Sequence, residues 1–302
     1  MKYTCISFNI LGIDEADVLG VEGSETGLYA PSGVRAGYIA DFLERSGADI
    51  VGIQEAGSHH GLYDWQTNFG GMIEKSGRYG IVNIGNEPEY IRTTTTFADK
   101  KVPLSAGLMI LYLKSRFELA ASGAHRYSSK ESQERYFQWA HLRDIADGRS
   151  VFVTNTHWSI NRDENGRFSP EAGAANRTLQ AEELLDFWKK EVGDNILFAT
   201  GDFNCPPAAE CLSLLEKDIY KRAENAARPN VELGHHIDNI FVNSQLVNVT
   251  DCHFSKEKID LSTLRPDLAP AYYWFMKEKQ SAPHRFDRMS DHDPLIVTVE
   301  TL

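Results

Sequence analysis

Short apolar segments that end in polar residues are the feature of this sequence that most limits its fold. Strand-like length and composition, with β-branched residues or alternating apolar positions, occur in segments 3–10, 48–54, 107–113, 117–121, 137–145, 150–157, 195–200, 238–242, 246–254 and 294–300. Apolar residues at helical spacing occur in 34–46 and 172–190. Because strands outnumber helices and Asp147-Gly148 is typical of a hairpin turn, a purely parallel sheet is disfavoured. The pattern predicts two mixed β-sheets packed face to face with helices on the outside.

Composition adds limits on size and partners. The chain has 302 residues, of which 42% are hydrophobic, and it contains no internal repeat or linker-like stretch. We therefore expect a single domain over residues 1–302. The formal net charge of -12 argues against tight, non-specific binding of nucleic acid, although a local basic patch remains compatible with it.

Cysteine usage and hydropathy bear on the compartment. The four cysteines form no CxxC pair and no dense framework, so we expect reduced and mostly buried thiols. The sequence starts directly with a strand-like run rather than a signal peptide, and its longest apolar run, at 104–113, is too short to span a bilayer. We therefore expect a cytoplasmic protein without a transmembrane segment or an obligate protein partner.

Polar residues stand at the ends of several strand-like segments, where packing does not require them. They are Asn9, Glu55, His157, the pair Asp202 and Asn204, and the Asp291-His292 pair before the last strand. Any one of them alone is more often a helix cap or a turn residue. Together they are hard to explain as independent turns, and strand ends meet at one edge of a sheet, where ligands bind in open α/β sheets.

The residue types indicate the chemistry. The oxygen ligands of Asn9, Glu55, Asp202 and Asp291 suit Mg²⁺, with Mn²⁺ as an alternative, rather than a closed zinc site. His157 and His292 can donate to a phosphate or transfer protons, and Asp238 can fix the tautomer of a histidine.

The order of these motifs resembles that of a known group. Phe8-Asn9, Gln54-Glu55, Gly201-Asp202-Phe203-Asn204 and Ser290-Asp291-His292 closely resemble the motifs of the endonuclease/exonuclease/phosphatase superfamily. That superfamily includes pancreatic deoxyribonuclease, abasic-site endonucleases, deadenylases, neutral sphingomyelinases and inositol polyphosphate phosphatases. The resemblance covers nearly the whole chain and implies an α/β (α+β) four-layer sandwich.

The resemblance also implies roles for individual residues. Glu55, helped by Asn9 and Asp291, corresponds to the Mg²⁺ site, and Asp202 to the group that orients or deprotonates the attacking water. Asn204 and His157 correspond to residues that contact the phosphate. His292 corresponds to a residue that contacts the phosphate and acts in acid–base catalysis, with Asp238 fixing its orientation.

Other positions carry weaker expectations. Arg177 is expected either to face the substrate or to pair with a carboxylate. Trp274 belongs to the aromatic and basic segment 262–289, which either binds substrate by stacking or forms a small satellite core. The insertion 12–33 is either a solvated loop or a substrate lid. In many relatives Leu-Asp-His follows the motif Asn155-Thr156-His157, whereas here segment 158–161 has a different sequence.

The function expected is that of a Mg²⁺- or Mn²⁺-dependent phosphoesterase that hydrolyses a phosphodiester, as a nuclease does, by attack of water at phosphorus. The substrate is then a phosphate ester, with nucleic acid or a nucleotide as candidates. The alternative is a phosphatase or phosphodiesterase of a small molecule or lipid head group, such as an inositol phosphate, nucleotide or sphingomyelin-like compound. A non-catalytic binding module is disfavoured because every expected polar position is filled.

Overall fold

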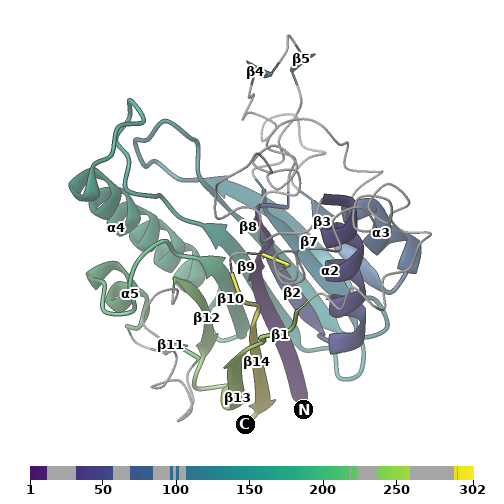
Figure 1. Cartoon of the computed structure of the whole chain (residues 1–302). Coiled ribbons are helices and arrows are strands. Elements are labelled where there is room, and N and C mark those ends of the chain that lie inside the picture. The colour runs from purple at the N-terminus through teal and green to yellow at the C-terminus, as the bar shows by residue number, and fades with distance from the viewer. Residues whose placement is uncertain are drawn as a thin grey trace, which may run out of the picture.

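The computed structural model confirms the predicted fold class. It describes residues 1–11, 32–56, 69–83, 96–97, 100–101, 107–217, 219–223, 237–258, 289–290 and 292–302. Within these residues lie two six-stranded mixed sheets and a separate two-stranded ladder of β4 (Thr96–Phe97) and β5 (Lys100–Lys101) (Figure 1).

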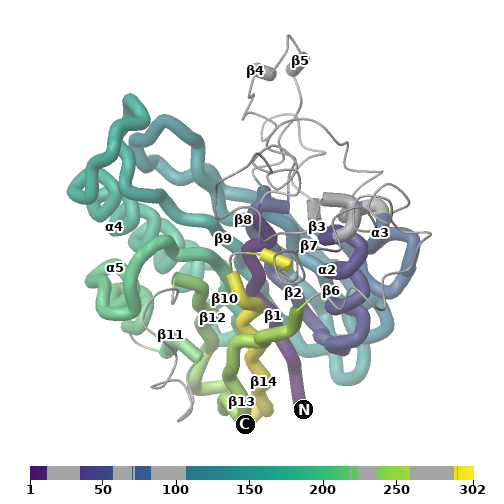
Figure 2. The backbone as a smooth tube through the Cα atoms, viewed as in Figure 1, coloured from purple at the N-terminus to yellow at the C-terminus, as the bar shows by residue number. Residues whose placement is uncertain are grey.

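Both large sheets have a strand order that differs from the order along the chain. The first sheet runs β13 (Val247–Phe254), β14 (Leu295–Thr301), β1 (Lys2–Asn9), β2 (Ile50–Gln54), β6 (Met109–Leu113), β3 (Tyr79–Asn83). The second runs β11 (Tyr220–Arg222), β12 (Asp238–Asn243), β10 (Ile196–Asp202), β9 (Ser150–His157), β8 (Tyr136–Asp144), β7 (Phe117–Arg126). The first and last strands of the chain, β1 and β14, are antiparallel neighbours, so the two ends lie close together (Figure 2).

Each large sheet contains one parallel pair near its centre, and its other neighbouring strands are antiparallel. In the first sheet β1 pairs with β2, and the chain between them includes helix α2 (Ser32–Ser46). In the second sheet β9 pairs with β10 through helix α4 (Pro170–Phe187). Parallel strands require such a crossover, and their carboxyl ends then lie at the same edge of the sheet. The two parallel pairs therefore bring four strand ends to one rim of the molecule.

Three apolar clusters divide the molecule into four layers. One cluster lies between the first sheet and the helices α2 and α3 (Phe69–Ser76), and a second fills the space between the sheets. The third joins the second sheet to α4 and α5 (Glu210–Leu215). Figure 1 shows α2 and α3 on one side and α4 and α5 on the other. The helices therefore cover the outer faces, as the sequence predicts.

Alternation along β1 explains how one strand serves two layers. Ile6 and Phe8 belong to the outer cluster under α2, whereas Tyr3 and Cys5 belong to the cluster between the sheets. Since side chains alternate with a period of two, Asn9 must lie on the same face as Cys5, between the sheets. The sequence of the strand thus directs Asn9 toward the second sheet.

Several boundaries differ from the sequence predictions. Helix α4 begins earlier than expected because the Ser169 hydroxyl accepts a hydrogen bond from the backbone N–H of Ala172 and Pro170 takes the first helical position. Its last predicted turn is the π-helical turn Trp188–Val192. Strand β7 is longer than predicted, and α3, β3, α5 and β11 were not predicted because short elements carry weak periodicity.

Two smaller predictions are confirmed. The hairpin at Asp147-Gly148 connects β8 to β9, and Gly148 has the positive φ of 75° that such a turn requires. All four cysteines are free and buried, with the sulfur atoms of Cys205 and Cys211 3.5 Å apart.

Among the described residues, no helix is both long and apolar enough to cross a membrane.

Candidate active site

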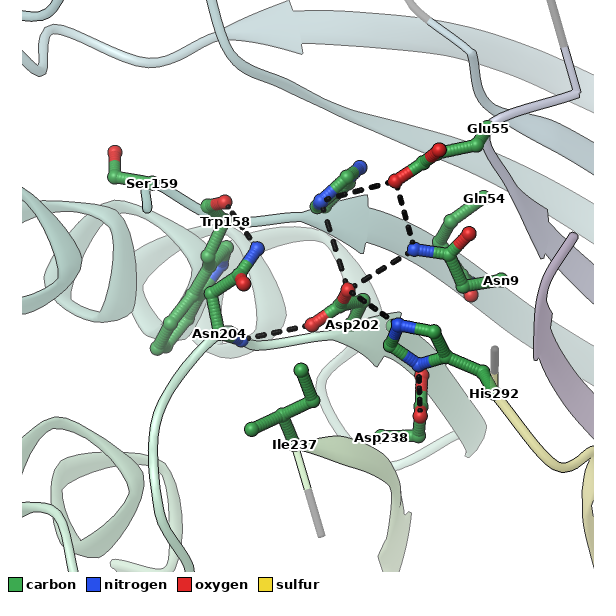
Figure 3. Close-up of polar contacts among 12 residues, drawn as sticks. Asn9, Gln54, Glu55, Trp158, Ser159, Asp202, Asn204, Ile237, Asp238 and His292 are labelled. Atoms are coloured by element: carbon green, nitrogen blue, oxygen red, sulfur yellow. Dashed lines mark hydrogen bonds and ion pairs between the residues drawn. The ribbon is translucent and has the colours of Figure 1, made fainter. Parts of the chain in front are cut away.

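The four ends of the two parallel strand pairs form one polar cluster. Asn9 and His157 are the last residues of β1 and β9, Asp202 is the last residue of β10, and Glu55 follows β2. The Asn9 amide nitrogen donates to Glu55 Oε1 and to Asp202 Oδ2, each at 3.0 Å (Figure 3). His157 Nε2 lies 3.6 Å from Asp202 Oδ2 and 4.0 Å from Glu55 Oε1. The cluster therefore joins the two sheets directly.

A histidine–aspartate pair forms a second side of the cluster. His292 Nδ1 lies 2.6 Å from Asp238 Oδ2, and His292 Nε2 lies 3.9 Å from Asp202 Oδ2 (Figure 3). Asp238 is the first residue of β12 and is the register partner of Asp202. A carboxylate at this distance from Nδ1 accepts its proton as a hydrogen bond, so it orients the ring with Nε2 toward Asp202.

Asn204 adjoins the cluster through the loop after β10. Its backbone N–H donates to Asp202 Oδ1 and its side-chain nitrogen to the carbonyl of Trp158, both at 2.9 Å. Trp158 is fully buried, with its ring 4.7 Å from that of Phe203. Trp158 begins segment 158–161, which differs in sequence from that of many relatives. Its buried ring fixes the position of the backbone carbonyl that accepts the hydrogen bond from Asn204.

Unusual backbone conformations concentrate at this rim. In the described part of the chain, the non-glycine residues with left-handed backbone are Leu11, Glu55 and Asn204, at φ of 52°, 58° and 49°. Each follows one of the strands that end at the cluster. Such conformations cost about 1–3 kcal/mol each and persist where neighbouring structure enforces them, often at functional sites.

Gly107 supports the conformation of Glu55. Its carbonyl accepts the N–H of Ala56 at 2.9 Å, and a Cβ at position 107 would lie 3.1 Å from Glu55 Cα. Gly107 itself has a φ of 66°. The sequence pattern does not reveal this role, because Gly107 is far from Glu55 along the chain and follows no strand.

Burial and charge set the acidity of Asp202. The carboxyl group is buried at the bottom of the cluster, whereas the side chains of His157, His292 and Glu55 are 14%, 12% and 19% exposed. The pKa of Asp202 is raised to about 7, first by burial and second by the neighbouring Asp238 carboxylate. His292 and hydrogen bonds from Asn204 and Asn9 oppose the increase.

The donor set fits a divalent cation. Asp202, Asp238 and His292 offer ligand atoms that all lie within 4.8 Å of one another. Glu55 Oε1 and the Asn9 side chain provide a second group of hard donors beside them. The neighbouring Asp238 carboxylate contributes to the raised pKa of Asp202 after burial, and a cation would offset the repulsion between the two carboxylates. Asp291, the third predicted ligand, lies outside the described residues.

Two further predicted substrate contacts are Arg177, which the structure describes, and Trp274, which it does not. Arg177 is buried on α4, and its guanidinium donates to the Ser159 carbonyl at 2.9 Å and to Asn161 Oδ1 at 3.0 Å. It pairs with no carboxylate in these contacts, contrary to one expectation, and holds the loop after β9. Its contact with substrate stays a prediction. Trp274 and the segments 12–31 and 262–288 lie outside the described residues.

Ser290 has a role that its motif alone does not reveal. Its hydroxyl donates to the Asn9 carbonyl at 2.7 Å and accepts the N–H of His292 at 3.3 Å. It therefore ties the end of β1 to the segment that carries His292. Serine is common in turns, so the residue type alone does not indicate this role. The role becomes visible only because Ser290 lies beside the end of β1 in the structure.

Comparison with known proteins identifies the family. A family model described as "Endonuclease/Exonuclease/phosphatase family" matches residues 6–292. The chain belongs to the endonuclease/exonuclease/phosphatase family. Members of this family are metal-dependent hydrolases of phosphate esters. A search of curated proteins gave no match.

Solved structures of the family share the fold across the whole chain. An endonuclease/exonuclease/phosphatase from Bacteroides vulgatus is 20% identical with a TM-score of 0.66, and each chain covers 100% of the other. The human Nocturnin catalytic domain with bound sulfate is 17% identical with a TM-score of 0.65 over 100% of this chain and 95% of that one. The mannosyl-6-phosphatase Bt3783 of Bacteroides thetaiotaomicron is 18% identical with a TM-score of 0.63, covering 99% of both chains.

Proposed function

We propose that this protein is a divalent-metal-dependent phosphoesterase that hydrolyses a phosphodiester by attack of water at phosphorus, as nucleases of the family do. The observation that carries the proposal is the convergence of Asn9, Glu55, His157 and Asp202 from four strand ends, beside the His292–Asp238 pair. Carboxylates for a metal, a carboxyl group with a pKa near neutrality and imidazole donors are the groups that phosphoester hydrolysis needs.

Glu55 and Asn9, together with Asp291, are proposed to hold Mg²⁺, with Mn²⁺ as the alternative. When bound, the metal supplies Lewis-acid stabilisation of the charge that develops on the phosphoryl oxygens. Glu55 suits this role because its oxygen lies beside Asn9 and its side chain is partly exposed. The left-handed backbone at Glu55 directs that side chain to the rim after the strand has ended.

Asp202 is proposed to accept the proton of the attacking water. A base is most effective when its pKa lies near the working pH, and the pKa of Asp202 is raised to about 7. As the water oxygen bonds to phosphorus, its proton moves to Asp202 and the bond from phosphorus to the leaving oxygen breaks. Protonated His292 then donates its Nε2 proton to that leaving oxygen, while Asp238 holds Nδ1.

His157 and Asn204 are proposed to bind the phosphoryl oxygens. His157 Nε2 faces the space between Glu55 and Asp202. The Asn204 amide uses one N–H for the Trp158 carbonyl, so its second N–H is available for a phosphate oxygen. Fixed donors aimed at developing charge lower the barrier because they need no reorganisation during the reaction.

A second candidate is a phosphatase or phosphodiesterase of a small molecule, such as a nucleotide, an inositol phosphate or a lipid head group. The net charge of -12 favours it over a nuclease, because a polyanionic substrate is repelled over a wide surface. The similarity to a mannosyl-6-phosphatase also supports a small phosphate ester as substrate. Both candidates use the same side chains.

The experiment compares hydrolysis of bis-p-nitrophenyl phosphate and p-nitrophenyl phosphate with Mg²⁺, Mn²⁺ or a chelator. Metal-dependent cleavage of the diester supports the phosphodiesterase, whereas cleavage of the monoester alone supports the phosphatase. Asp202→Ala and His292→Ala should each abolish nearly all hydrolysis while remaining folded. His253→Ala is the matched control, because His253 is an exposed histidine on the edge strand β13, two strands away from β1, with its Nδ1 2.8 Å from Asp251 Oδ2. Full activity in either site variant contradicts the proposal.

A further inference from the structure

A layer of polar side chains lies between the sheets immediately below the candidate active site. It comprises Ser7, Gln54, Asn155 and Thr200, and we call it the inter-sheet polar layer. All four are buried from solvent. The rest of the space between the sheets is filled mainly by apolar side chains such as Tyr3, which makes a polar layer there unexpected.

Asn155 lies at the centre of this layer and bonds to both sheets. Its amide nitrogen donates to the carbonyls of Ile53 at 2.7 Å and Met109 at 3.2 Å, both in the first sheet. Its amide oxygen accepts from Gln54 Nε2 of the first sheet at 2.6 Å and from Thr200 Oγ1 of the second at 3.1 Å. Both hydrogens of the Asn155 amide are therefore directed across the gap.

Ser7 makes a separate link between the sheets. Its hydroxyl oxygen, on β1, accepts the backbone N–H of Gly201, on β10, at 3.1 Å, and Gln54 Nε2 lies 3.4 Å from the same oxygen. The bonded amide is the one directly before Asp202. The backbone that carries the proposed base is thus tied to the strand that carries Asn9.

Gly52 shows how closely the sheets approach at this level. A Cβ at position 52 would lie 1.8 Å from Thr200 Oγ1 and 2.9 Å from Asn155 Oδ1. Any side chain there would displace the second sheet from the first. The close approach and the hydrogen bonds are independent observations of the same tight contact.

The layer has a fixed relation to the site. Three members of the layer lie two positions before a site residue on the same strand, so each shares a face of the sheet with that residue. These pairs are Ser7 with Asn9, Asn155 with His157, and Thr200 with Asp202. The fourth member, Gln54, lies directly before Glu55. A shift in this layer is therefore transmitted directly to the strand ends above it.

We propose that the inter-sheet polar layer positions the two halves of the active site, with Asn155 as its principal positioning residue. This inference rests on the proposed function. The proposed metal ligands Asn9 and Glu55 come from the first sheet, whereas His157 and Asp202 come from the second. Apolar contacts are non-directional and allow packed sheets to adjust, whereas hydrogen bonds fix distance and direction. The layer thereby holds Asn9 Nδ2 at 3.0 Å from Asp202 Oδ2.

This role predicts a split between catalysis and metal binding. Asn9 and Glu55, the described residues that we propose as metal ligands, belong to one sheet, so a shift between the sheets leaves their mutual geometry intact. The same shift moves Asp202 relative to Asn9 and Glu55, the residues that would hold the metal, and a displacement of about 1 Å can lower the rate about 100-fold. A residue that only stabilised the fold would lower the melting temperature without changing kcat per folded molecule.

The experiment uses Asn155→Leu in the full-length protein, with Val153→Ala as the matched control. Val153 is a buried apolar residue between the sheets, two positions earlier on β9. Three quantities are measured: kcat on the better nitrophenyl substrate, the dissociation constant for Mn²⁺ by electron paramagnetic resonance, and the Asn9–Asp202 distance in crystal structures. Should Asn155→Leu fail to fold, Thr200→Val replaces it, with Thr200→Ser as the conservative variant that restores the hydroxyl.

We expect Asn155→Leu to lower kcat about 100-fold, leave Mn²⁺ affinity unchanged and lengthen the Asn9–Asp202 distance. Val153→Ala should have a lower melting temperature than the wild-type protein and an unchanged kcat. Any of three results would overturn the positioning role: wild-type kcat in the folded variant, an unchanged Asn9–Asp202 distance, or loss of Mn²⁺ binding together with the loss of kcat. The same criteria apply to Thr200→Val, and Thr200→Ser should then restore kcat. If wild-type protein hydrolyses neither substrate, the proposed function fails, and the crystallographic distance alone decides the positioning role.

Discussion

Replacing Asp202 with asparagine should change how the stability of the metal-free protein depends on pH. The pKa of this carboxyl group is raised from 3.8 to about 7, mainly by burial. Between these pH values the folded protein keeps the proton that the unfolded chain has lost. The unfolded state then binds fewer protons, so stability falls as pH rises and levels off above pH 7. The full change corresponds to about 4 kcal/mol, of which about 3 kcal/mol falls between pH 5 and pH 8.

Asp202→Asn removes this titration while nearly preserving shape. The asparagine oxygen still accepts the N–H of Asn204, but its nitrogen faces the Asn9 nitrogen in place of an acceptor. That lost hydrogen bond costs about 1 kcal/mol at every pH and so cancels from the pH dependence. Relative to the variant, the wild-type protein should therefore lose about 3 kcal/mol of unfolding free energy from pH 5 to pH 8.

The measurement is urea unfolding of both proteins at the two pH values in the presence of a chelator. Asp186→Asn is the control, because it removes an exposed carboxylate from α4; its pH dependence should match that of the wild-type protein. An equal difference between wild type and Asp202→Asn at both pH values would show that Asp202 is ionised throughout. The argument for Asp202 as a base with a pKa near neutrality would then be refuted.

Three other substitutions test neighbouring parts of the site. Gly107→Ala should destabilise the fold by about 1–2 kcal/mol, since φ is positive there and the new Cβ presses on Glu55, and should weaken metal activation. Asp238→Asn should lower kcat about 100-fold, because the amide carries no negative charge to stabilise protonated His292 and can present an N–H to Nδ1, which favours the other tautomer of the ring, while Asp251→Asn on the exposed pair should have no effect. Glu55→Gln should raise the metal concentration needed for half-maximal hydrolysis before it lowers the maximal rate.

Each of these has an outcome that contradicts it. Normal metal activation in folded Gly107→Ala would mean that Gly107 does not position Glu55. Wild-type kcat in Asp238→Asn would separate His292 from its proposed role in proton transfer. An unchanged metal titration in Glu55→Gln would remove Glu55 from the metal site.

The sequence alone predicts which segments form strands or helices and which polar residues are candidates for the site. Alternation in β1 assigns one face to Tyr3 and Cys5 and thereby to Asn9, and an apolar run that stops at Glu55 marks a buried strand with a polar end. These signals are local, since a strand or helix is encoded by the spacing of apolar residues within it. They predicted the two-sheet architecture and the strand ends at which the cluster lies.

How these strand ends meet depends on the stacking of the two sheets, which the sequence pattern does not predict. The sequence does not state that one parallel pair lies at the centre of each sheet, so it could not place Asn9 within 3.0 Å of Asp202. The sequence left open whether Arg177 faces the substrate or pairs with a carboxylate, and it did not predict the hydrogen bonds of Arg177 to Ser159 and Asn161 in the loop after β9. The contact of Gly107 with Glu55, and the bonds of Asn155 to both sheets, join residues far apart in the chain. Such contacts depend on how the sheets are stacked, and no local pattern encodes that stacking, because apolar burial drives the sheets together without specifying which side chains face each other.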